Sequence, residues 1–198
     1  MDDGIGQVVK ALKKNGVYDN SIIVFTSDNG EHLPSKANNG LFRDGKQSMY
    51  EGGLKVPTCI SWPKKIESKS IIKNILTTID LYPTLLEFAG IRRKETIEGE
   101  SFSQDLLNTK EADSQERSLF FSRREGGQGY GGRAIYAVRK GDWKLLQNKP
   151  QQAYELYNLS NDPKEQHNLI QQHPKIYRDL NKALMRHIQK AASVPWQK

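Results

Sequence analysis

The stretch that decides the fold runs from Ile22 to Pro57 and opens with Ile-Ile-Val-Phe-Thr-Ser-Asp-Asn-Gly. Its first four residues are apolar and mostly β-branched, which is typical of a buried strand and favours a parallel one. Ligands of open α/β sheets bind just beyond the carboxyl ends of such strands, where Asp28 and Asn29 offer two hard oxygen ligands side by side. Lys46 follows in a glycine-framed loop. The stretch therefore predicts a metal-assisted site for an anion.

A purely structural interpretation stands beside this one. Asn29 and Gly30 are a common turn pair after a strand, and a lysine in a polar loop is often simply solvated. The glycines at positions 45, 52 and 53 favour the functional interpretation, because glycine lets the backbone approach a bound group closely. The ammonium of Lys46 is a compact point charge that suits a tetrahedral oxyanion.

The composition excludes several classes of protein. The 198 residues carry a net charge of +7, but the lysines and arginines are scattered in short pairs. A nucleic-acid-binding protein more often concentrates them on one face, so we expect no nucleic-acid partner. The single cysteine, Cys59, excludes an internal disulfide and a thiolate zinc cluster, and we predict that it is a core residue. No stretch reaches the ~20 apolar residues that span a bilayer, so we expect no membrane span.

Residues 1–95 predict the C-terminal part of a large α/β domain. The chain opens with a helix that no strand precedes, and we therefore expect that upstream sequence is missing. The predicted elements around the opening stretch are a helix over 1–15, a strand over 54–62, a strand or short helix over 71–79, and a helix over 80–90 that Asp80 caps. Pro57 indicates that the strand over 54–62 lies at an edge or begins after that residue.

Residues 96–117 are polar and weakly patterned, and they predict a connection with one short helical turn. Residues 118–198 predict a small α+β C-terminal subdomain, in which an antiparallel sheet carries a terminal helix. Gly141 and Asp142 are the turn residues of a predicted hairpin. The predicted elements are strands over 119–122, 134–140, 143–146 and 154–159 and an amphipathic helix over 174–192.

Six stretches, in order and over nearly the whole chain, resemble the C-terminal half of a formylglycine-dependent sulfatase of the alkaline-phosphatase-like superfamily. The resemblance implies an α/β fold, in which the end of a mixed-sheet domain is followed by a small antiparallel sheet with a C-terminal helix. The stretches are Met-Asp-Asp-Gly-Ile-Gly (1–6), Val-Phe-Thr-Ser-Asp-Asn-Gly (24–30), Lys-Gln-Ser-Met-Tyr-Glu-Gly-Gly-Leu-Lys-Val-Pro (46–57), Asp-Leu-Tyr-Pro-Thr (80–84), Ala-Val-Arg-Lys-Gly-Asp-Trp-Lys-Leu-Leu (137–146), and Glu-Leu-Tyr-Asn-Leu-Ser-Asn-Asp-Pro (155–163) with Asn-Leu (168–169).

The resemblance also implies an activity and its residues. It implies hydrolysis of sulfate monoesters, carried by small molecules or carbohydrates, with a bound calcium ion. Asp28 and Asn29 match two metal ligands of the family, and Lys46 matches the lysine that contacts the substrate sulfate. The family is often exported, so a periplasmic or extracellular location fits the resemblance. It does not indicate an oligomeric state.

The chain departs from the family at the nucleophile. The family makes a formylglycine from Cys or Ser in a Cys/Ser-x-Pro/Ala-x-Arg motif, and this motif is absent here, as is the family's early pair of aspartate metal ligands. Cys59 lies in Thr-Cys-Ile-Ser-Trp-Pro, which lacks the pattern. We therefore expect a fragment whose nucleophile lies upstream and which has no sulfatase activity by itself.

Several residues and activities remain as alternatives. We interpret His32 as a surface histidine and Arg43 as a solvated side chain, although each follows the site closely in sequence. Arg123, Arg124 and the glycine loop to Gly132 are a hypothetical border of the substrate cleft. Alternative functions are a phosphodiesterase or phosphonate hydrolase of the same superfamily, and a non-catalytic module that binds sulfated glycans.

Overall fold

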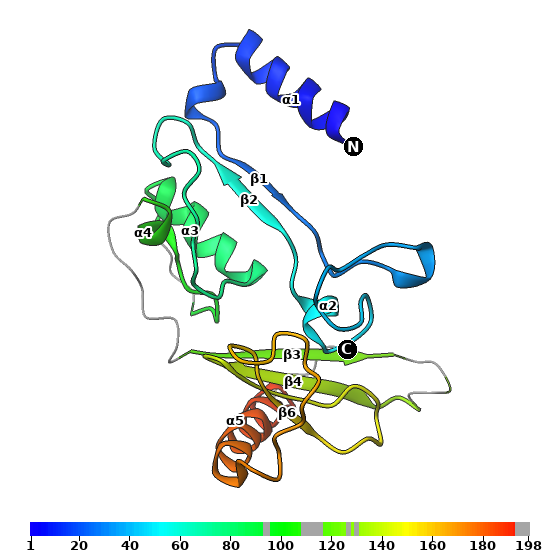
Figure 1. The fold of residues 1–198 in the computed structure, drawn as a ribbon. Coiled ribbons are helices and arrows are strands. Elements are labelled where there is room, and N and C mark those ends of the chain that lie inside the picture. Colours follow the sequence, from blue (N-terminus) through cyan, green and yellow to red (C-terminus); the bar gives the residue numbers. More distant parts are fainter. Residues whose placement is uncertain (93–95, 108–116, 126–127, 129–130, 193–198) are drawn as a thin grey trace. The chain divides into compact units, whose positions relative to one another are not determined.

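The computed structural model describes residues 1–92, 96–107, 117–125, 128 and 131–192 (Figure 1). By contacts the chain divides into two compact units. Unit 1 comprises residues 1–26 and 58–114, and unit 2 comprises residues 27–57 and 115–198. The segment 27–57 therefore packs with the C-terminal part of the chain rather than with the strand that precedes it. The predicted bounds at 95/96 and 117/118 stay a prediction, and residues 93–95 and 108–116 lie outside the described part.

Unit 1 is built around a two-stranded sheet. Its strands are β1 (Ile23–Thr26) and β2 (Thr58–Ser61), which pair antiparallel with Thr26 opposite Thr58. Its helices are α1 (Asp2–Lys14), η1 (Tyr18–Asn20), η3 (Thr78–Asp80), α3 (Leu81–Phe88) and α4 (Ser103–Leu106). One face of the sheet packs through Ile22 and Ile60 on a core that includes Trp62 and Phe102.

Several predictions for unit 1 are wrong. Within the described residues β1 pairs antiparallel with β2, not parallel, and Phe25 is 38% exposed, so the strand is not buried on both faces. Cys59 pairs with Phe25 across the sheet and is likewise exposed, so it is not a core residue. By contrast, β2 begins at Thr58, directly after Pro57, in agreement with the start that the proline indicates. Residues 71–79 form no regular strand or α-helix before η3.

Asp80 caps a different helix from the predicted one. Its buried carboxylate accepts hydrogen bonds from the backbone N–H and the hydroxyl of Thr77, at 2.8 and 2.9 Å, and so closes a capping box on η3. The other carboxylate oxygen accepts from the N–H of Glu100 at 2.9 Å. Helix α3 itself begins without a side-chain cap, and Gly90 follows it with a φ of +69°. The helix exists as predicted, but the aspartate serves the preceding turn and a distant loop.

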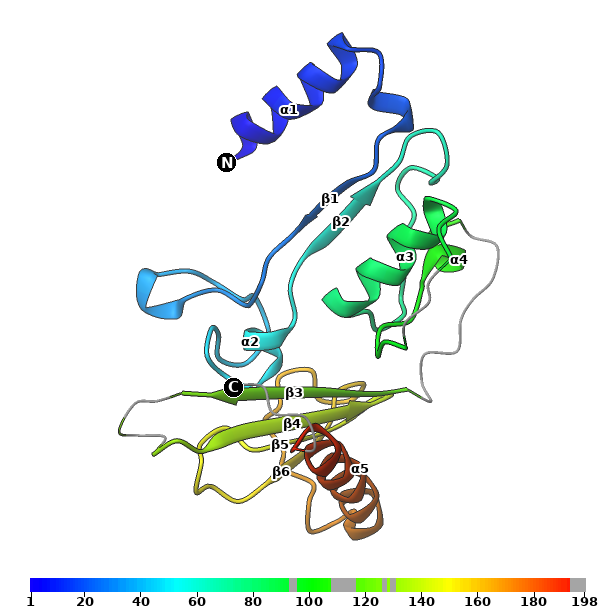
Figure 2. The same ribbon diagram turned by 180° about the vertical axis from the view of Figure 1, so that it is seen from behind.

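Unit 2 is a four-stranded antiparallel sheet covered on both faces. The order is β3 (Ser118–Arg124), β4 (Ala134–Lys140), β5 (Trp143–Leu146) and β6 (Glu155–Asn158), as the alternation and the Gly141-Asp142 turn predict. Helix α5 (Pro174–Ala192) packs on one face, and the segment with η2 (Leu33–Ser35) and α2 (Glu51–Leu54) lies on the other (Figures 1 and 2). The predicted sheet and terminal helix are confirmed.

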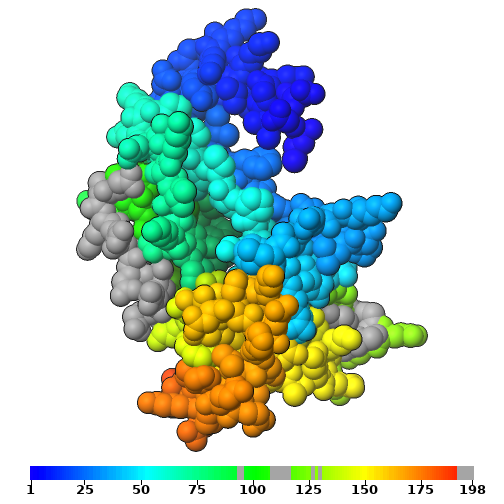
Figure 3. Space-filling view, viewed as in Figure 1, coloured from blue at the N-terminus to red at the C-terminus, as the bar shows by residue number. Residues whose placement is uncertain are grey.

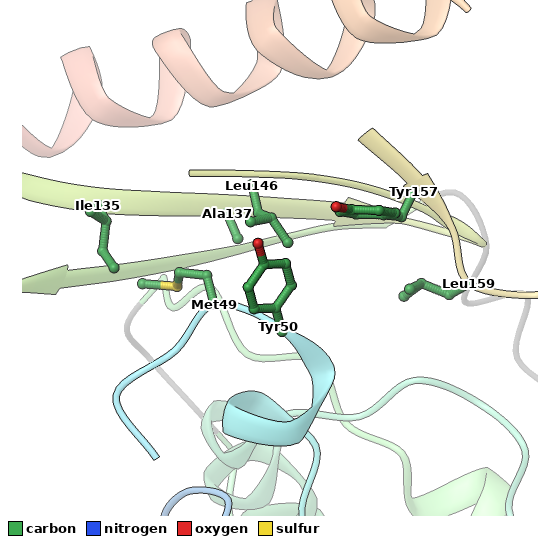
Figure 4. Packing of buried hydrophobic residues seen from close by; sticks show 7 residues of the cluster. All are labelled: Met49, Tyr50, Ile135, Ala137, Leu146, Tyr157 and Leu159. Carbon is green, nitrogen blue, oxygen red and sulfur yellow. The ribbon is translucent and has the colours of Figure 1, made fainter. Parts of the chain in front are cut away.

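The two faces of this sheet hold separate cores. Side chains that alternate along β4 go to opposite sides: Val138 packs with Leu180 and Leu184 of α5, while Ile135 and Ala137 pack with the segment before α2. Figure 4 shows this second core, in which Met49 and Tyr50 point at the sheet from the α2 side. In the space-filling view the same segment, in light blue, lies against the yellow and orange atoms of unit 2 (Figure 3). Residues 27–57 thus form one layer of unit 2.

None of the helices in the described part of the chain is both long and apolar enough to cross a membrane.

Candidate functional site

The turn that follows β1 is held by a close backbone approach. The N–H of Gly30 donates to the carbonyl of Gly53 at 3.0 Å, and the hydroxyl of Ser27 donates to the carbonyl of Asn29 at 2.8 Å. A Cβ built on Gly30 would lie 1.7 Å from the carbonyl oxygen of Gly52, so no other residue fits without movement of the backbone. The glycine of the Asp-Asn-Gly turn is therefore required by the contact with α2.

The loop that carries Lys46 is tied to the same turn. The N–H of Lys46 donates to the carbonyl of Glu31 at 2.9 Å. The Asn39 side chain accepts from the N–H of Glu31 at 2.9 Å and donates to the carbonyl of Asp44 at 2.8 Å, so it links the two ends of the loop. A Cβ on Gly45 would lie 2.3 Å from the carbonyl oxygen of Glu31. The structure thus brings the backbone of Lys46 beside the Asp-Asn-Gly turn, 16 to 18 residues earlier in the sequence.

Asn29 and Lys46 line the same open hollow, which measures about 490 Å³. Asp28 is exposed and is not one of its lining residues. The opposite side of the hollow comes from β3. The full lining is Asn29, Lys46, Gln47, Ser48, Met49, Gly53, Leu54, Phe120, Phe121, Ser122 and Arg123. All of these residues belong to unit 2, so the hollow is a feature of one compact body.

Arg123 stands at the rim of the hollow in a fixed position. Its guanidinium donates to the carbonyl of Gln47 and forms an ion pair with Glu125. Arg124 instead donates to the carbonyl of Gly132 at 3.0 Å. Of the two arginines predicted to border the substrate cleft, Arg123 lines the hollow and Arg124 does not. Residues 126–127 and 129–130 of the predicted glycine loop lie outside the described residues.

His32 and Arg43 have different outcomes. His32 is exposed and its Nδ1 shares a hydrogen bond of 2.7 Å with the hydroxyl of Ser35, in agreement with the surface interpretation. The prediction that Arg43 is a solvated side chain is wrong. It donates to the carbonyl of Glu165 at 2.6 Å and to the hydroxyl of Tyr157 at 3.1 Å, and its guanidinium lies 3.8 Å from the ring centre of Tyr50.

A buried charge cluster beside the site escaped the sequence analysis. Lys144 Nζ lies 2.9 Å from Glu51 Oε1 and 3.0 Å from Glu165 Oε1, and both Lys144 and Glu165 are fully buried. Arg139 donates to the second oxygen of Glu51 at 3.1 Å. The sequence signal was that Lys144 stands two residues before Leu146 in β5. The two side chains therefore share one face of the sheet, and that face is apolar.

Opposing effects act on the two carboxylates of this cluster. Burial favours the protonated form of Glu51, but the cations of Lys144 and Arg139 outweigh it and hold its pKa below the ordinary value. Burial dominates at Glu165 and raises its pKa, although Lys144 and the N–H of Glu51 oppose the change. The two cations therefore hold Glu51 as a carboxylate. The ion pair with Lys144 offsets part of the cost of burying Glu165.

The described residues contain no group of three or more His, Cys, Asp or Glu side chains that could hold a metal ion. Asp28 and Asn29 are neighbours in sequence whose side-chain oxygens are the kind of donor that calcium prefers. Calcium takes six to eight oxygen ligands, so these two fit it in kind but would supply only part of a set.

Comparison with known proteins identifies the family. The family model of the N-sulphoglucosamine sulphohydrolase C-terminal domain matches residues 38–193, and the chain belongs to this family. Among curated proteins, an N-acetylgalactosamine-6-O-sulfatase of Bacteroides thetaiotaomicron is 28% identical over 213 residues, which covers 93% of this chain and 39% of the relative. The curated relatives are sulfatases, so the predicted resemblance is confirmed.

Solved structures share the fold. A structure of Ps i-CgsB in complex with k-i-k-neocarrahexaose is 32% identical with a TM-score of 0.81, covering 96% of this chain and 40% of that one. BT4656, solved with its substrate D-glucosamine-2-N,6-O-disulfate, is 28% identical with a TM-score of 0.79, covering 97% and 39%. This chain spans about 30–39% of the length of the first curated relatives it matches.

Proposed function

We propose that the chain is the C-terminal part of a sulfuric ester hydrolase, and that the hollow at Asn29 and Lys46 receives the sulfate group of its substrate. The observation that carries the proposal is the pairing of two separate segments. The Gly30–Gly53 and Lys46–Glu31 backbone hydrogen bonds bring the Asp-Asn-Gly turn and the lysine loop to one hollow. Membership of a sulfatase family supports the same activity.

Lys46 is proposed to bind and stabilise the sulfate group. Cleavage of a sulfate monoester places negative charge on the sulfate oxygens and the leaving oxygen, and an ammonium group opposes this charge. At ~4 Å and an effective dielectric constant of 20, the attraction amounts to about 4 kcal/mol. Because Lys46 is exposed, its ammonium is available to an incoming anion.

Asp28 and Asn29 are proposed to be two ligands of a calcium ion whose remaining ligands come from elsewhere in the protein. When bound, the ion would supply positive charge against the sulfate oxygens. The residues of this chain contribute the oxygens and hold them on a turn that Gly30 fixes to α2. The test is whether sulfate ester turnover by the complete protein depends on a divalent metal ion.

The nucleophile is proposed to lie outside these residues. No Cys/Ser-x-Pro/Ala-x-Arg motif occurs in the chain, and Cys59 lies on an exposed strand of unit 1. We therefore expect the 198-residue chain alone to be inactive toward sulfate esters. Turnover of 4-nitrophenyl sulfate by the purified chain, at a rate above that of a Lys46→Ala preparation, would refute this part of the proposal.

The substrate is proposed to be a carbohydrate sulfate. Phe121 and Arg123 lie at the hollow on the same face of β3, so apolar ring surface and a cation occur together there, whereas the ring of Phe120 stacks on His187 of α5 on the opposite face. Aromatic faces suit the C–H faces of a sugar ring, and a guanidinium suits an acidic substituent. Some relatives support this class, since one is an N-acetylgalactosamine-6-O-sulfatase and BT4656 was solved with D-glucosamine-2-N,6-O-disulfate, whereas others are a steryl-sulfatase and an arylsulfatase A.

The decisive experiment uses the complete protein that contains this chain. Turnover of sulfated N-acetylhexosamines, 4-nitrophenyl sulfate and a matched phosphonate ester is measured for the wild type, Lys46→Ala and Lys149→Ala. We expect sulfate esters to be preferred, and Lys46→Ala to lower turnover by roughly 10²–10³. Lys149, an exposed lysine of unit 2 that does not line the hollow, serves as the control. Near-normal turnover by Lys46→Ala, or a preference for the phosphonate, would overturn the proposal.

A further inference from the structure

The buried cluster of Glu51, Lys144 and Glu165 links three distant parts of unit 2. Glu51 is the first residue of α2, Lys144 lies in the middle of β5, and Glu165 follows β6. Lys144 is within 3.0 Å of both carboxylates. In addition, Glu165 Oε2 accepts the N–H of Glu51 at 2.6 Å. One lysine therefore connects the start of α2 to the sheet through both of its acidic partners.

Stability alone does not account for such a cluster. Buried ion pairs are often no more stabilising than well-packed apolar side chains of similar volume, because desolvation offsets their attraction. The face around Lys144 already has an apolar core in Ile135, Ala137 and Leu146, so an apolar side chain would fit the surroundings. What the charges add is a defined position, because an ammonium group between two carboxylates fixes where α2 lies on the sheet.

Helix α2 in turn positions both halves of the candidate site. Gly53 accepts the N–H of Gly30 through its carbonyl, and Gly52 donates its N–H to the carbonyl of Arg43 at 3.0 Å. A Cβ on Gly52 would lie 2.1 Å from the carbonyl oxygen of Asp44, so α2 and the lysine loop touch with no spare room. A displacement of α2 would therefore move both the Asp-Asn-Gly turn and the loop that carries Lys46.

Further hydrogen bonds anchor the residues just before α2 to the same sheet. The hydroxyl of Tyr50 donates to Glu155 Oε2 at 2.6 Å, and the hydroxyl of Tyr157 donates to the same oxygen at 2.7 Å. The N–H of Met49 donates to the side-chain oxygen of Asn148 at 2.7 Å. These contacts fix the segment laterally, whereas the Lys144 cluster fixes the first turn of α2 itself.

We propose that Lys144, with Glu51 and Glu165, is a positioning set that holds Lys46 and Asn29 at the hollow from the C-terminal sheet. The functional half of this inference rests on the proposed role of Lys46 in binding sulfate. The structural half does not, because it concerns only how the loop and the turn are held. The two halves can therefore be tested separately.

The structural half is tested by hydrogen exchange on the 198-residue chain. The variant is Lys144→Met with Glu165→Gln, which removes one charge of each sign and leaves Glu51 paired with Arg139. We expect the amides of Gly30, Lys46 and Gly52 to exchange at least tenfold faster than in the wild type, with less than twofold change in the β3–β4 ladder. Leu184→Ala, which weakens the opposite core under α5, is the control and is expected to leave those three amides unchanged relative to the ladder.

Two results would overturn the structural half. One is unchanged exchange at Gly30 and Lys46, and the other is uniform acceleration over the whole sheet, which describes a general loss of stability. If the double variant fails to fold, Glu165→Gln alone is used, because it keeps the side-chain volume and leaves Lys144 paired with Glu51. It is expected to accelerate the same amides by a smaller factor, and the same two results would count against it.

The functional half is tested by a double-mutant cycle in the complete protein. Lys144→Met/Glu165→Gln is expected to lower kcat/KM at least tenfold when Lys46 is present, but less than twofold in a Lys46→Ala background. Equal losses in the two backgrounds would overturn the positioning role, because a purely structural defect does not depend on Lys46. If Lys46→Ala alone retained normal turnover, the proposed function would fail while the exchange result on the loop stood.

Discussion

Replacing Lys144 with methionine should destabilise the chain severely. The ammonium lies 2.9 and 3.0 Å from two buried carboxylates, and the side chain has no exposed surface. Methionine fills a similar volume but leaves Glu51 and Glu165 facing each other, with Arg139 as the cation that remains beside Glu51. Breaking a buried ion pair by removing one partner costs about 3–5 kcal/mol. We expect a loss of this size in the free energy of unfolding at pH 7.

The loss should depend on pH, and its sign follows from Glu165. Burial already raises the pKa of this carboxyl above its ordinary value of 4.5, and Lys144 opposes the change, so removing the lysine raises the pKa further. A raised pKa in the folded state adds no penalty below the unfolded value, a penalty that grows as pH rises from the unfolded to the folded value, and a constant penalty above the folded value. The deficit of the variant should therefore shrink between pH 7 and pH 5, by at most about 2.7 kcal/mol for one proton.

Urea unfolding of the wild type and Lys144→Met at pH 7, 6 and 5 measures both effects, with the exposed lysine variant Lys149→Met as the control. Only the difference between variant and wild type is compared at each pH, since other carboxylates also titrate in this range. A deficit under 1 kcal/mol at pH 7, or one that stays constant down to pH 5, would refute the reasoning about the buried cluster.

Three more results are expected. Gly30→Ala should lower the free energy of unfolding by about 1–3 kcal/mol in urea titrations, because its Cβ would lie 1.7 Å from the carbonyl oxygen of Gly52. The control Gly4→Ala, whose Cβ would have nothing within 4 Å, should be neutral or slightly stabilising. Equal effects of the two substitutions would contradict the crowding argument. Leu184→Ala should cost about 2–5 kcal/mol by the same measurement, whereas the partly exposed Met185→Ala should cost far less, and similar losses would contradict the core under α5. Chelation of divalent metal should abolish sulfate ester turnover by the complete protein, calcium should restore it, and Asp28→Ala should weaken the restoration; activity that survives exhaustive chelation would refute the calcium proposal.

Local patterns predicted the C-terminal unit well. The alternation in residues 134–146, broken by Gly141 and Asp142, specifies a hairpin whose two faces differ, and the structure has it with the predicted bounds. Helix α5 begins at the predicted Pro174, where the apolar spacing begins. In both cases the signal lies within about twenty residues of sequence, because the hydrogen-bonding partners are close along the chain.

The errors occur where partners are distant. An apolar run such as Ile22–Phe25 does not say which strand pairs with it, so the antiparallel neighbour at Thr58–Ser61 was not anticipated. Lys144 lies in one of the stretches that resemble the family, but the local sequence does not show whether a charge in a strand is solvated or buried. It is buried here because Glu51 and Glu165, both distant in sequence, pair with it. The site residues were predicted from their place after an apolar run and in a glycine-framed loop, and the resemblance gave them roles. The structure adds that the lysine loop and the turn meet through glycine contacts.

The assignment of residues 27–57 to unit 2 has a consequence for the order in which the protein folds. This segment is synthesised early, yet its partners come late: Arg43 bonds Tyr157 and Glu51 bonds Glu165, each across 114 positions in sequence. Loop closure over such distances is entropically costly and slows folding. Until β5 and β6 have left the ribosome, the loop that carries Lys46 has no layer to pack against. The candidate site therefore matures only after β5, β6 and Glu165 have been synthesised, and the terminal sheet sets the time at which the proposed anion site can form.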